Sequence, residues 1–403
     1  MLEFISSRRF LRLWTLFYVC CLAVLVADGF SRGIITYGFC DMFINYSGGF
    51  VRRGLLGSLF LWGNSHSVSP VMTAVVVCGA SFVLVGLYLI REFRKRGYAP
   101  ELLTMCFLLG GVGVYGLQFL RRDFFILLMF LIVMLLRRRL SLAAWLVVGN
   151  VVSVFTILCY EPFAFFSLPF FVLATRLRMG SWVRSALCWL PSAVCFLVCC
   201  KYSGDGETYR AMCASTHDFL GTPGIMDFIQ KKSTDVLKFH LKMNFLKTDH
   251  FLPNVVVSCF SIMGFIYYMI NAVAMYARDR VGEMRWRGAM LLLLLCGIGF
   301  LLPMFLCLST DYARLLIYVA VSALVVRFTL SGDELLSLFP KPLYAASDRL
   351  VSALDRLLPP SRLKILFVMM FVGVAAWTYK GGFDFLLNCE VGVAVRAVLA
   401  LVG

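Results

Sequence analysis

The stretch FFILLMFLIVMLL, residues 124–136, has no polar side chain, and it lies between Arg121-Arg122-Asp123 and Arg137-Arg138-Arg139. An uninterrupted apolar run between charged turns is typical of a helix in the hydrocarbon core of a bilayer. Similar runs recur at about 12–28, 70–90, 102–119, 140–159, 162–175, 185–200, 254–277, 288–308, 314–330 and 363–379. The sequence therefore predicts an all-α polytopic integral membrane protein with about 11 transmembrane helices.

The composition agrees with this fold class. Of 403 residues, 61% are hydrophobic and 15% are charged, and the mean hydropathy is +0.86. A water-soluble domain carries roughly 25% charged residues, so a conventional soluble globule is excluded. The net charge of +16 comes without the motifs of nucleic-acid readers, and we expect no nucleic-acid partner. Most of the 15 cysteines fall inside apolar runs, where they are expected to pack as small apolar side chains.

Lysines and arginines predict the orientation of the helices. With a cytoplasmic N-terminus, 23 of the 38 basic residues fall in inner segments, in clusters such as Arg137-Arg138-Arg139. This asymmetry follows the positive-inside rule. We treat residues 1–403 as a single membrane domain with outer loops at 29–69 and 201–253 and an inner loop at 331–362.

Each of these three loops contains a further predicted helix. The apolar piece 55–62 in the first outer loop predicts a re-entrant or interfacial helix. Apolar residues at near-helical spacing among lysines predict an amphipathic helix over 225–245 on the outer headgroup layer. The inner loop predicts a surface helix over 347–358 that ends at Pro359-Pro360. Whether the tail after residue 380 re-enters the membrane is left open.

Several arginines lie in outer connections, where the positive-inside rule disfavours them. Each has an acid nearby in sequence, and one more acid occupies the outer turn Tyr160-Glu161-Pro162. Guanidinium groups bind phosphate oxygens bidentately, and a carboxylate beside them can act as a general base. We therefore take Arg52, Arg53, Arg121, Arg122 and Arg314 as candidate phosphate-binding residues, and Asp41, Glu161, Asp123 and Asp311 as candidate catalytic residues. The alternative is that these ion pairs only cap turns and fix helix packing.

The sequence around Arg52 and Arg53 is rich in glycine. Gly48, Gly49 and Gly54 flank the two arginines, and such a stretch can leave backbone N–H groups free to face an anion. A helix that follows would add the positive end of its dipole. Aromatic residues gather in the same loop, where they could stack on sugar rings or form an interfacial belt.

The four histidines form no two-histidine metal motif, and we predict no metal site, although a divalent cation held by carboxylates is left open. In the second outer loop we take Arg210, His217 and Asp218 as candidate substrate-loop residues, with His217-Asp218 as the first pair to test. The sequence has no nucleotide-binding fingerprint and no Cys-x-x-Cys motif, so we expect no bound cofactor.

The stretch Gly48–Gly57 beside an outer-loop aspartate, with Arg121-Arg122-Asp123 and Asp311-Tyr312-Ala313-Arg314, resembles uncharacterised membrane proteins of bacterial surface-polysaccharide clusters. In size and topology the chain also resembles the O-antigen polymerase (Wzy) type and, more broadly, the GT-C glycosyltransferases. The motif-level resemblance covers only these short stretches. The polymerases have an arginine and a glycine separated by ten residues in large outer loops, and Arg210 with Gly221 matches this spacing. Arg52 with Gly63 matches it too, so the spacing by itself is weak.

The resemblance implies a glycosyltransferase of the bacterial inner membrane that polymerises O-antigen or related repeat units at the periplasmic face. Its donor and acceptor would be undecaprenyl-linked oligosaccharides, with a chain-length regulator protein as a further partner. Asp41 would be the first choice of general base and Glu161 the second.

Two alternatives are kept. One is a GT-C-type enzyme that adds a single sugar from a polyprenyl monophosphate donor. The other is a transporter or flippase of lipid-linked glycan, which would be expected to place its basic residues near the middle of the membrane.

Overall fold

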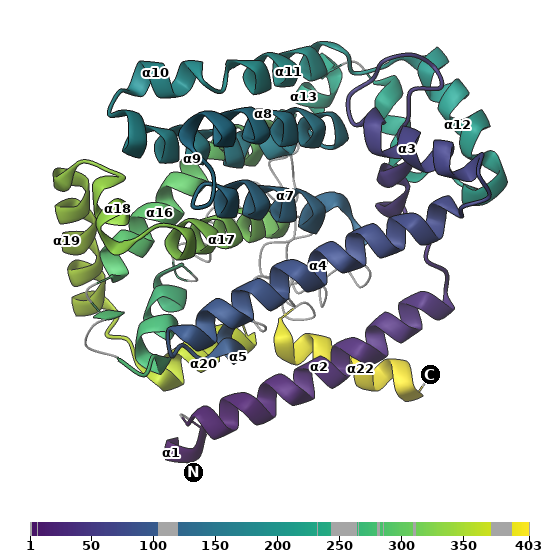
Figure 1. Ribbon diagram of the computed structural model, residues 1–403. Helices are drawn as coiled ribbons and strands as arrows, with labels where there is room; N and C mark the ends of the chain where they lie inside the picture. Colours follow the sequence, from purple (N-terminus) through teal and green to yellow (C-terminus); the bar gives the residue numbers. More distant parts are fainter. Residues whose placement is uncertain are drawn as a thin grey trace. The chain divides into compact units, whose positions relative to one another are not determined.

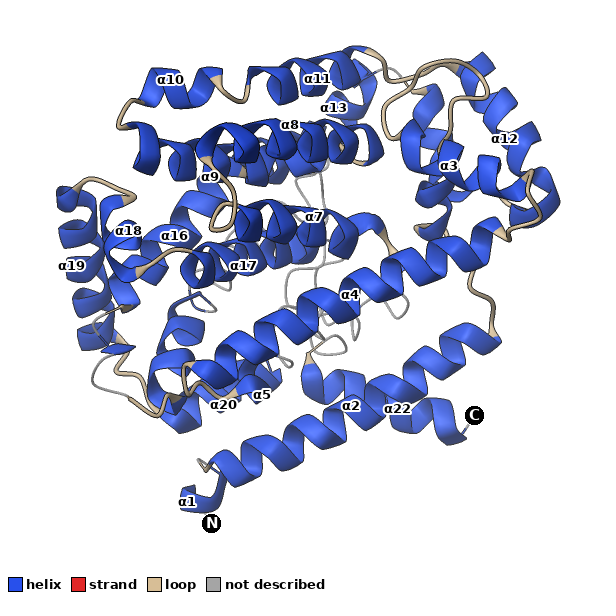
Figure 2. Ribbon diagram, in the orientation of Figure 1, coloured by secondary structure: helices blue, strands red, loops and turns tan. Residues whose placement is uncertain are grey.

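The computed structural model describes residues 2–5, 7–103, 120–231, 233–242, 264, 266–279, 283–284, 286–308, 312–371 and 389–402. Within these residues every regular element is helical, as Figure 2 shows. The predicted all-α class is thus confirmed for the described part of the chain. The chain divides into two compact units, made of residues 1–32, 86–117 and 241–403 and of residues 33–85 and 118–240.

Unit 1 contains the two ends of the chain. Its helices are α1 (Leu2–Ile5), α2 (Arg8–Ser31), α5 (Pro100–Leu103), α16 (Arg287–Phe300), η6 (Met304–Leu308), α17 (Tyr312–Thr329), α18 (Gly332–Ser337), α19 (Lys341–Leu357), α20 (Arg362–Phe371) and α22 (Glu390–Val402), with a further helix over Ile266–Tyr276. The N-terminal α2 packs along the C-terminal α22 (Figure 1), and α16 packs against α17 and α19.

Unit 2 contains the candidate site. Its helices are η1 (Phe39–Phe43), α3 (Gly54–Asn64), α7 (Arg122–Leu136), α8 (Leu142–Cys159), α9 (Pro162–Met179), α10 (Trp182–Leu187), α11 (Leu190–Lys201), α12 (Gly206–Leu220), η4 (Gly224–Gln230) and α13 (Ser233–Leu241). The long helix α4 (Pro70–Lys95) runs across the division between the units.

Two buried tryptophans hold the helices of unit 2 together. Trp145 of α8 donates its indole N–H to the Val133 carbonyl of α7 at 2.8 Å, and Trp189 donates to the Thr175 hydroxyl of α9 at 2.9 Å. The two rings meet edge to face with 5.5 Å between centroids. Gly149 of α8 lies against Trp189, where a Cβ atom would come within 2.6 Å of the indole ring. The tryptophans therefore join α8 to the C-terminal part of α7 and the start of α11 to the C-terminal part of α9 in a packed core.

Three helices among the described residues are long and apolar enough to cross a bilayer: Arg8–Ser31, Pro70–Lys95 and Leu142–Cys159. Each exposes large apolar side chains, for example Leu16, Val76 and Val147, as expected for helices surrounded by lipid. Leu190–Lys201, Ile266–Tyr276 and Arg287–Phe300 are shorter apolar helices. The structure therefore supports a membrane-embedded helical protein, and the number of about 11 spans stays a prediction.

The predicted apolar runs coincide with helices wherever the structure describes them, but two runs are broken. The run at 185–200 is divided between α10 and α11, and Pro191 lies in the first turn of α11. The run at 288–308 is divided between α16 and η6, with Pro303 between them. Proline has no N–H for a helix interior, which accounts for breaks that hydropathy alone does not reveal. The run at 102–119 lies mostly outside the described residues.

The predicted loop helices have mixed outcomes. The piece 55–62 is inside α3, and the inner surface helix is α19, which begins at Lys341 and ends at Leu357 before the two prolines. The stretch 225–245 is not one helix, because Lys231 has an extended backbone (φ −88°, ψ 133°) between η4 and α13. Residues 243–245 lie outside the described part. The structure adds α12, which begins where Asp205 accepts a hydrogen bond from the Thr208 N–H.

Candidate functional site

Five charged side chains from separate segments of unit 2 come together: Asp41, Arg52, Arg53, Arg122 and Glu161. We call them the arginine cluster. Asp41 comes from η1, the two adjacent arginines precede α3, Arg122 begins α7, and Glu161 precedes α9. Three guanidinium groups face two carboxylates, so the five groups together carry one excess positive charge.

Glu161 and Arg53 form the tightest pair of the cluster. The Arg53 Nε lies 2.9 and 2.7 Å from the two carboxylate oxygens of Glu161, and its Nη2 lies 2.6 Å from Oε1. The same guanidinium lies 4.8 Å from the centre of the Tyr160 ring. Burial by itself would raise the pKa of the Glu161 carboxyl, but Arg53 and then Arg52 lower it below its ordinary value. Burial likewise opposes the charge of Arg53, and the two carboxylates still raise its pKa well above its ordinary value.

Arg122 is the most deeply buried member of the cluster, with 1% of its side chain exposed. Its guanidinium donates hydrogen bonds to the backbone carbonyls of Asp41, Arg53 and Cys159. Its Nε is 3.8 Å from a carboxylate oxygen of Asp41. One side chain thus ties three chain segments together, and most of its donors are used for that purpose.

The backbone at Arg53 has an unusual conformation. Its φ is +67°, in the left-handed region that few residues other than glycine adopt. The residue precedes the first turn of α3, and its side chain reaches both Glu161 and Asp41, the latter at 3.4 Å. These ion pairs compensate for a backbone that costs on the order of 1–3 kcal/mol.

The glycines of this loop allow close packing, and three of the loop's N–H groups are bonded within the protein. The N–H groups of Gly49, Arg52 and Gly54 donate to the carbonyls of Tyr46, Tyr202 and Val51. A Cβ atom at Gly48 would lie 2.6 Å from the backbone of Thr208, and one at Gly57 would lie 2.2 Å from the Ile44 carbonyl oxygen. The glycine-rich sequence therefore lets η1, α3 and α12 approach each other closely.

Arg52 differs from the other two arginines because its side chain is only partly used. Its Nη1 is 3.8 Å from a Glu161 oxygen, and its buried Nε has no hydrogen-bond partner within the described structure. Burial lowers the pKa of this guanidinium, and the attraction of Glu161 does not offset the effect. Since the excess positive charge of the cluster is least compensated here, Arg52 is its best candidate for binding an anion.

Aromatic side chains lie next to Arg52. Tyr46 stacks on Phe50 with 5.4 Å between ring centroids, and Phe50 meets Tyr202 edge to face at 5.6 Å. Phe50 and Tyr202 are both exposed, while the Tyr202 carbonyl accepts the hydrogen bond of the Arg52 N–H. The backbone of Arg52 is therefore bonded to a segment that carries an exposed aromatic side chain, and Phe50 lies two residues before it in the chain.

The remaining predicted residues do not all join the cluster. Arg121 precedes α7, where its side chain lies against Gly38, and Asp123 is buried in the first turn of the same helix. Arg314 is half-buried in α17 of unit 1. Asp311 lies outside the described residues.

The predicted substrate-loop residues all lie on α12 and face away from the cluster's loop. Arg210, His217 and Asp218 are exposed, with His217 and Asp218 at 85% and 98%. The opposite face of α12 is buried and includes Thr208, Met212, Thr216 and Leu220.

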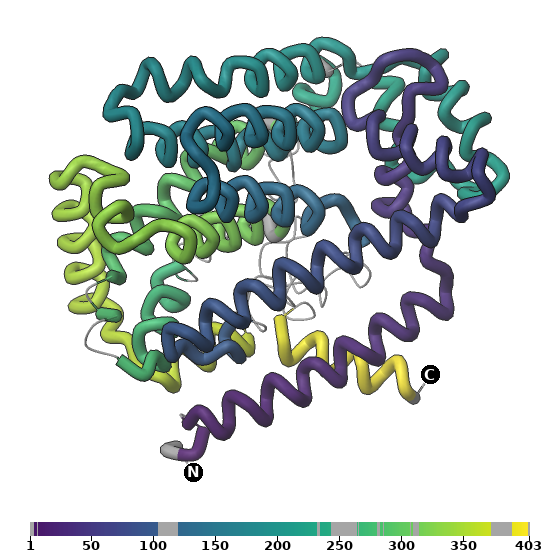
Figure 3. The backbone as a smooth tube through the Cα atoms, in the orientation of Figure 1, coloured from purple at the N-terminus to yellow at the C-terminus, as the bar shows by residue number. Residues whose placement is uncertain are grey.

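Sequence reasoning missed that the described part of the loop predicted at 201–253 packs on the loop predicted at 29–69. Asn45 donates to the Ser215 hydroxyl at 3.1 Å, and the Ile225 N–H donates to the Tyr37 carbonyl at 3.1 Å. Figure 3 shows the early chain winding beside the segment that contains α12. Thr208, Met212 and Thr216, spaced four residues apart, were the available signal for this buried face. Sequence reasoning also did not predict the cation–π contact between Arg53 and the Tyr160 ring, although Tyr160 directly precedes Glu161 in the chain.

Among the residues that the structure describes, no group of three or more metal-ligating side chains is found. Comparisons of the chain with protein-family models, with curated proteins and with solved structures gave no match. The arginine cluster itself is therefore the basis for assigning a function.

Proposed function

We propose that the protein is a glycosyltransferase of the bacterial inner membrane that uses undecaprenyl-linked sugars at the periplasmic face. In its most specific form, the proposal is that it polymerises O-antigen or related polysaccharide repeat units. The observation that carries the proposal is the incompletely used guanidinium of Arg52, in a loop that also carries the exposed Phe50 and is bonded to the backbone of the exposed Tyr202. An anionic lipid-linked sugar supplies phosphate oxygens for the guanidinium and sugar rings for the aromatic faces.

In this proposal the three arginines of the cluster have different roles. Arg53 and Arg122 are held by carboxylates and backbone carbonyls, so in this proposal they are positioning residues. Arg52 contacts the phosphate of the donor. Its positive charge stabilises the negative charge that develops when the lipid phosphate departs, an electrostatic effect that is often the largest contribution to catalysis.

The reaction proceeds as a substitution at the anomeric carbon of the donor sugar. An acceptor hydroxyl oxygen forms the new glycosidic bond while the bond from the anomeric carbon to the phosphate oxygen breaks. The lipid diphosphate leaves with the electron pair, and the hydroxyl proton passes to a carboxylate. We assign this role to Asp41, because its contact with Arg53 is longer, at 3.4 Å, than the 2.6 Å contact of Glu161.

The test is the polysaccharide made by a deletion strain that expresses variants of the protein. Arg52→Ala is expected to lower the amount of long-chain product about 10²–10³-fold, the usual effect of removing one donor to a developing anion. Arg52→Lys should recover only part of the activity, because an ammonium has no bidentate fork. Arg139→Ala removes an exposed arginine in the same unit and is the matched control.

The length pattern of the product distinguishes the alternatives. A polymerase defect leaves single repeat units on the lipid core, whereas loss of a single-sugar transferase keeps the chain length and removes one branch sugar. Accumulation of the lipid-linked unit on the inner leaflet would instead indicate a flippase. A normal ladder from an expressed Arg52→Ala protein would overturn the proposal.

A further inference from the structure

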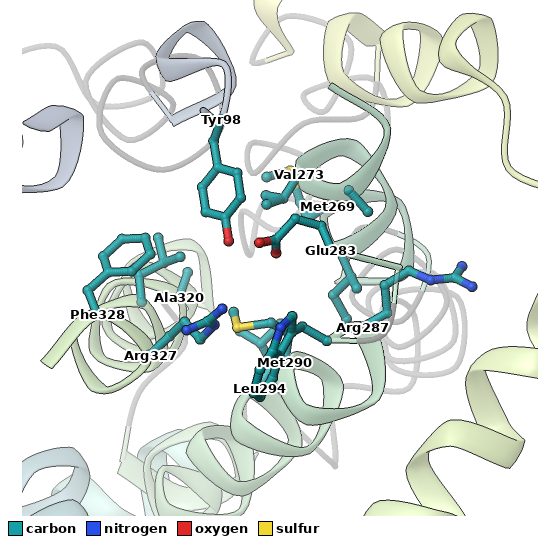
Figure 4. A pocket seen from close by; sticks show the side chains of 14 residues that line it. Tyr98, Met269, Val273, Glu283, Arg287, Met290, Leu294, Ala320, Arg327 and Phe328 are labelled. Atoms are coloured by element: carbon teal, nitrogen blue, oxygen red, sulfur yellow. The ribbon is translucent and has the colours of Figure 1, made fainter. Parts of the chain in front are cut away.

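Unit 1 contains a pocket that is separate from the arginine cluster. It lies among the turn after α4, the helix Ile266–Tyr276, α16 and α17, and it holds about 540 Å³ of empty space including its open mouth. Figure 4 shows Tyr98, Glu283 and Arg327 directed toward the pocket from different segments.

The walls of the pocket are mostly apolar. They include side chains from three helices: Met269, Val273, Met290, Leu294 and Ala320. An apolar lining with a few polar groups at the edge suits a ligand that is itself amphiphilic.

The carboxylate of the pocket is held by a phenol. Burial raises the pKa of Tyr98, and a hydrogen bond with Glu283 raises it further. The phenol therefore stays protonated and donates to the carboxylate, which keeps its second oxygen for another donor. The turn that carries Tyr98 is fixed, because the Arg278 N–H donates to the Gly97 carbonyl at 2.9 Å.

The guanidinium of Arg327 lies over the Trp286 ring, 4.7 Å from its centre. Within the described residues it has no carboxylate at ion-pair distance. Its neighbours differ: Arg96 pairs with Glu92 at 2.6 Å, and Arg287 pairs with Asp355 at 2.8 Å. Figure 4 shows the Arg287 guanidinium directed away from the pocket. The pocket thus presents one cation and one anion, and neither has an ion-pair partner at bonding distance among the described residues.

The segments around the pocket share one predicted side of the membrane. Residues 91–96, 278–287 and Arg327 belong to three predicted inner connections, and the structure brings Arg96, Arg278 and Arg327 into this part of unit 1. Besides the bond between Arg278 and Gly97, the Arg96 guanidinium lies 3.4 Å from the Phe328 carbonyl. Basic groups at this level face the headgroups of the inner leaflet.

We propose that this pocket binds a phospholipid whose headgroup has both a phosphate and a primary amine, of the phosphatidylethanolamine class. Arg327 takes the phosphate, and Glu283 accepts hydrogen bonds from the ammonium group. The apolar walls receive the start of an acyl chain. This inference is independent of the proposed glycosyl transfer.

The aromatic residues of the pocket favour a primary amine over a choline headgroup. A quaternary ammonium needs an open aromatic face, but a guanidinium lies over Trp286 and another lies 4.5 Å from the centre of the Phe328 ring. A phosphatidylglycerol headgroup has no cation, so it would leave the Glu283 carboxylate without a partner.

The test uses the purified, delipidated full chain in detergent and native mass spectrometry with lipids of identical acyl chains. Phosphatidylethanolamine is expected to bind at least tenfold more tightly than phosphatidylcholine or phosphatidylglycerol. Glu283→Gln and Arg327→Gln should each remove this preference, and Arg327→Lys should keep part of it. Asp333→Asn and Arg349→Gln, at exposed positions of the same unit, should retain it, as should Arg52→Ala.

Thermal unfolding without lipid checks that each variant is folded. Equal binding of the three lipids, or an unchanged preference in folded Glu283→Gln and Arg327→Gln proteins, would overturn the proposal. Soluble phosphoethanolamine is a second probe. Binding of this headgroup as tight as that of the lipid would show that the apolar walls contribute nothing, and would overturn the assignment to a lipid.

Discussion

Replacing Glu161 by glutamine removes one of the two negative charges of the arginine cluster and leaves its shape nearly unchanged. Arg53 would then keep only Asp41, at 3.4 Å, and Arg52 would lose the carboxylate at 3.8 Å. Removal of one partner from a buried ion pair costs about 3–5 kcal/mol. Because Asp41 stays near Arg53, we expect the lower end of this range, about 3 kcal/mol less free energy of unfolding.

The assay is unfolding of the purified protein in mixed micelles as the SDS fraction rises, followed by tryptophan fluorescence. The variants are Glu161→Gln, Arg53→Gln and the double variant. The double variant should be less destabilised than the sum of the two singles, with an interaction energy of about 2 kcal/mol. Asp218→Asn, at an almost fully exposed position of the same unit, should change the free energy of unfolding by less than about 0.5 kcal/mol. A loss below about 1 kcal/mol for Glu161→Gln, or strict additivity, would refute this account of the cluster.

Three further predictions concern pH and packing. Folding lowers the pKa of Glu161, so the ionised Glu161 carboxylate stabilises the fold fully above its ordinary pKa of 4.5 and stops doing so as the pH falls through the lowered pKa. The difference in unfolding free energy between wild type and Glu161→Gln should therefore shrink in acid. Gly57→Ala should destabilise the protein by about 1–3 kcal/mol through its clash with the Ile44 carbonyl, whereas Gly63→Ala, with no atom closer than 3.7 Å, should be neutral or slightly stabilising; equal melting temperatures would contradict this. Trp14→Phe removes the 2.7 Å hydrogen bond to the buried Glu390 carboxylate and should cost about 1–3 kcal/mol, and an unchanged melting temperature would show that the pair does not hold α22 on α2.

The fold class and most helix positions were predictable from the sequence, because an apolar run long enough for a bilayer has few alternatives to a helix. The helix breaks at Pro191 and Pro303 follow from the missing N–H of proline, which a hydropathy profile does not take into account. The helix α12 was not predicted, since its mixed composition resembles that of a solvated connector. The apolar residues of α12 predict a buried helix face only when the surface that they cover is known.

Candidate residues were predicted with less detail than the helices. The sequence suggested that acids would lie near arginines, and it paired Arg122 with Asp123 by proximity in the chain. In the structure, Arg122 contacts Asp41 and the backbone of two other segments. Long-range partners of this kind depend on how helices pack, which local sequence does not specify.

By itself, the sequence determined that the chain is helical and membrane-embedded in character, because hydropathy and the bilayer's exclusion of unpaired backbone groups act on each segment separately. It also identified the arginines that lie in predicted outer connections, where the positive-inside rule disfavours them. Only the tertiary structure decided which of them meet and how each is used. Arg52, Arg53 and Arg122 are the same residue type, yet Arg53 and Arg122 are held by carboxylates and backbone carbonyls, whereas the buried Nε of Arg52 has no hydrogen-bond partner within the described residues.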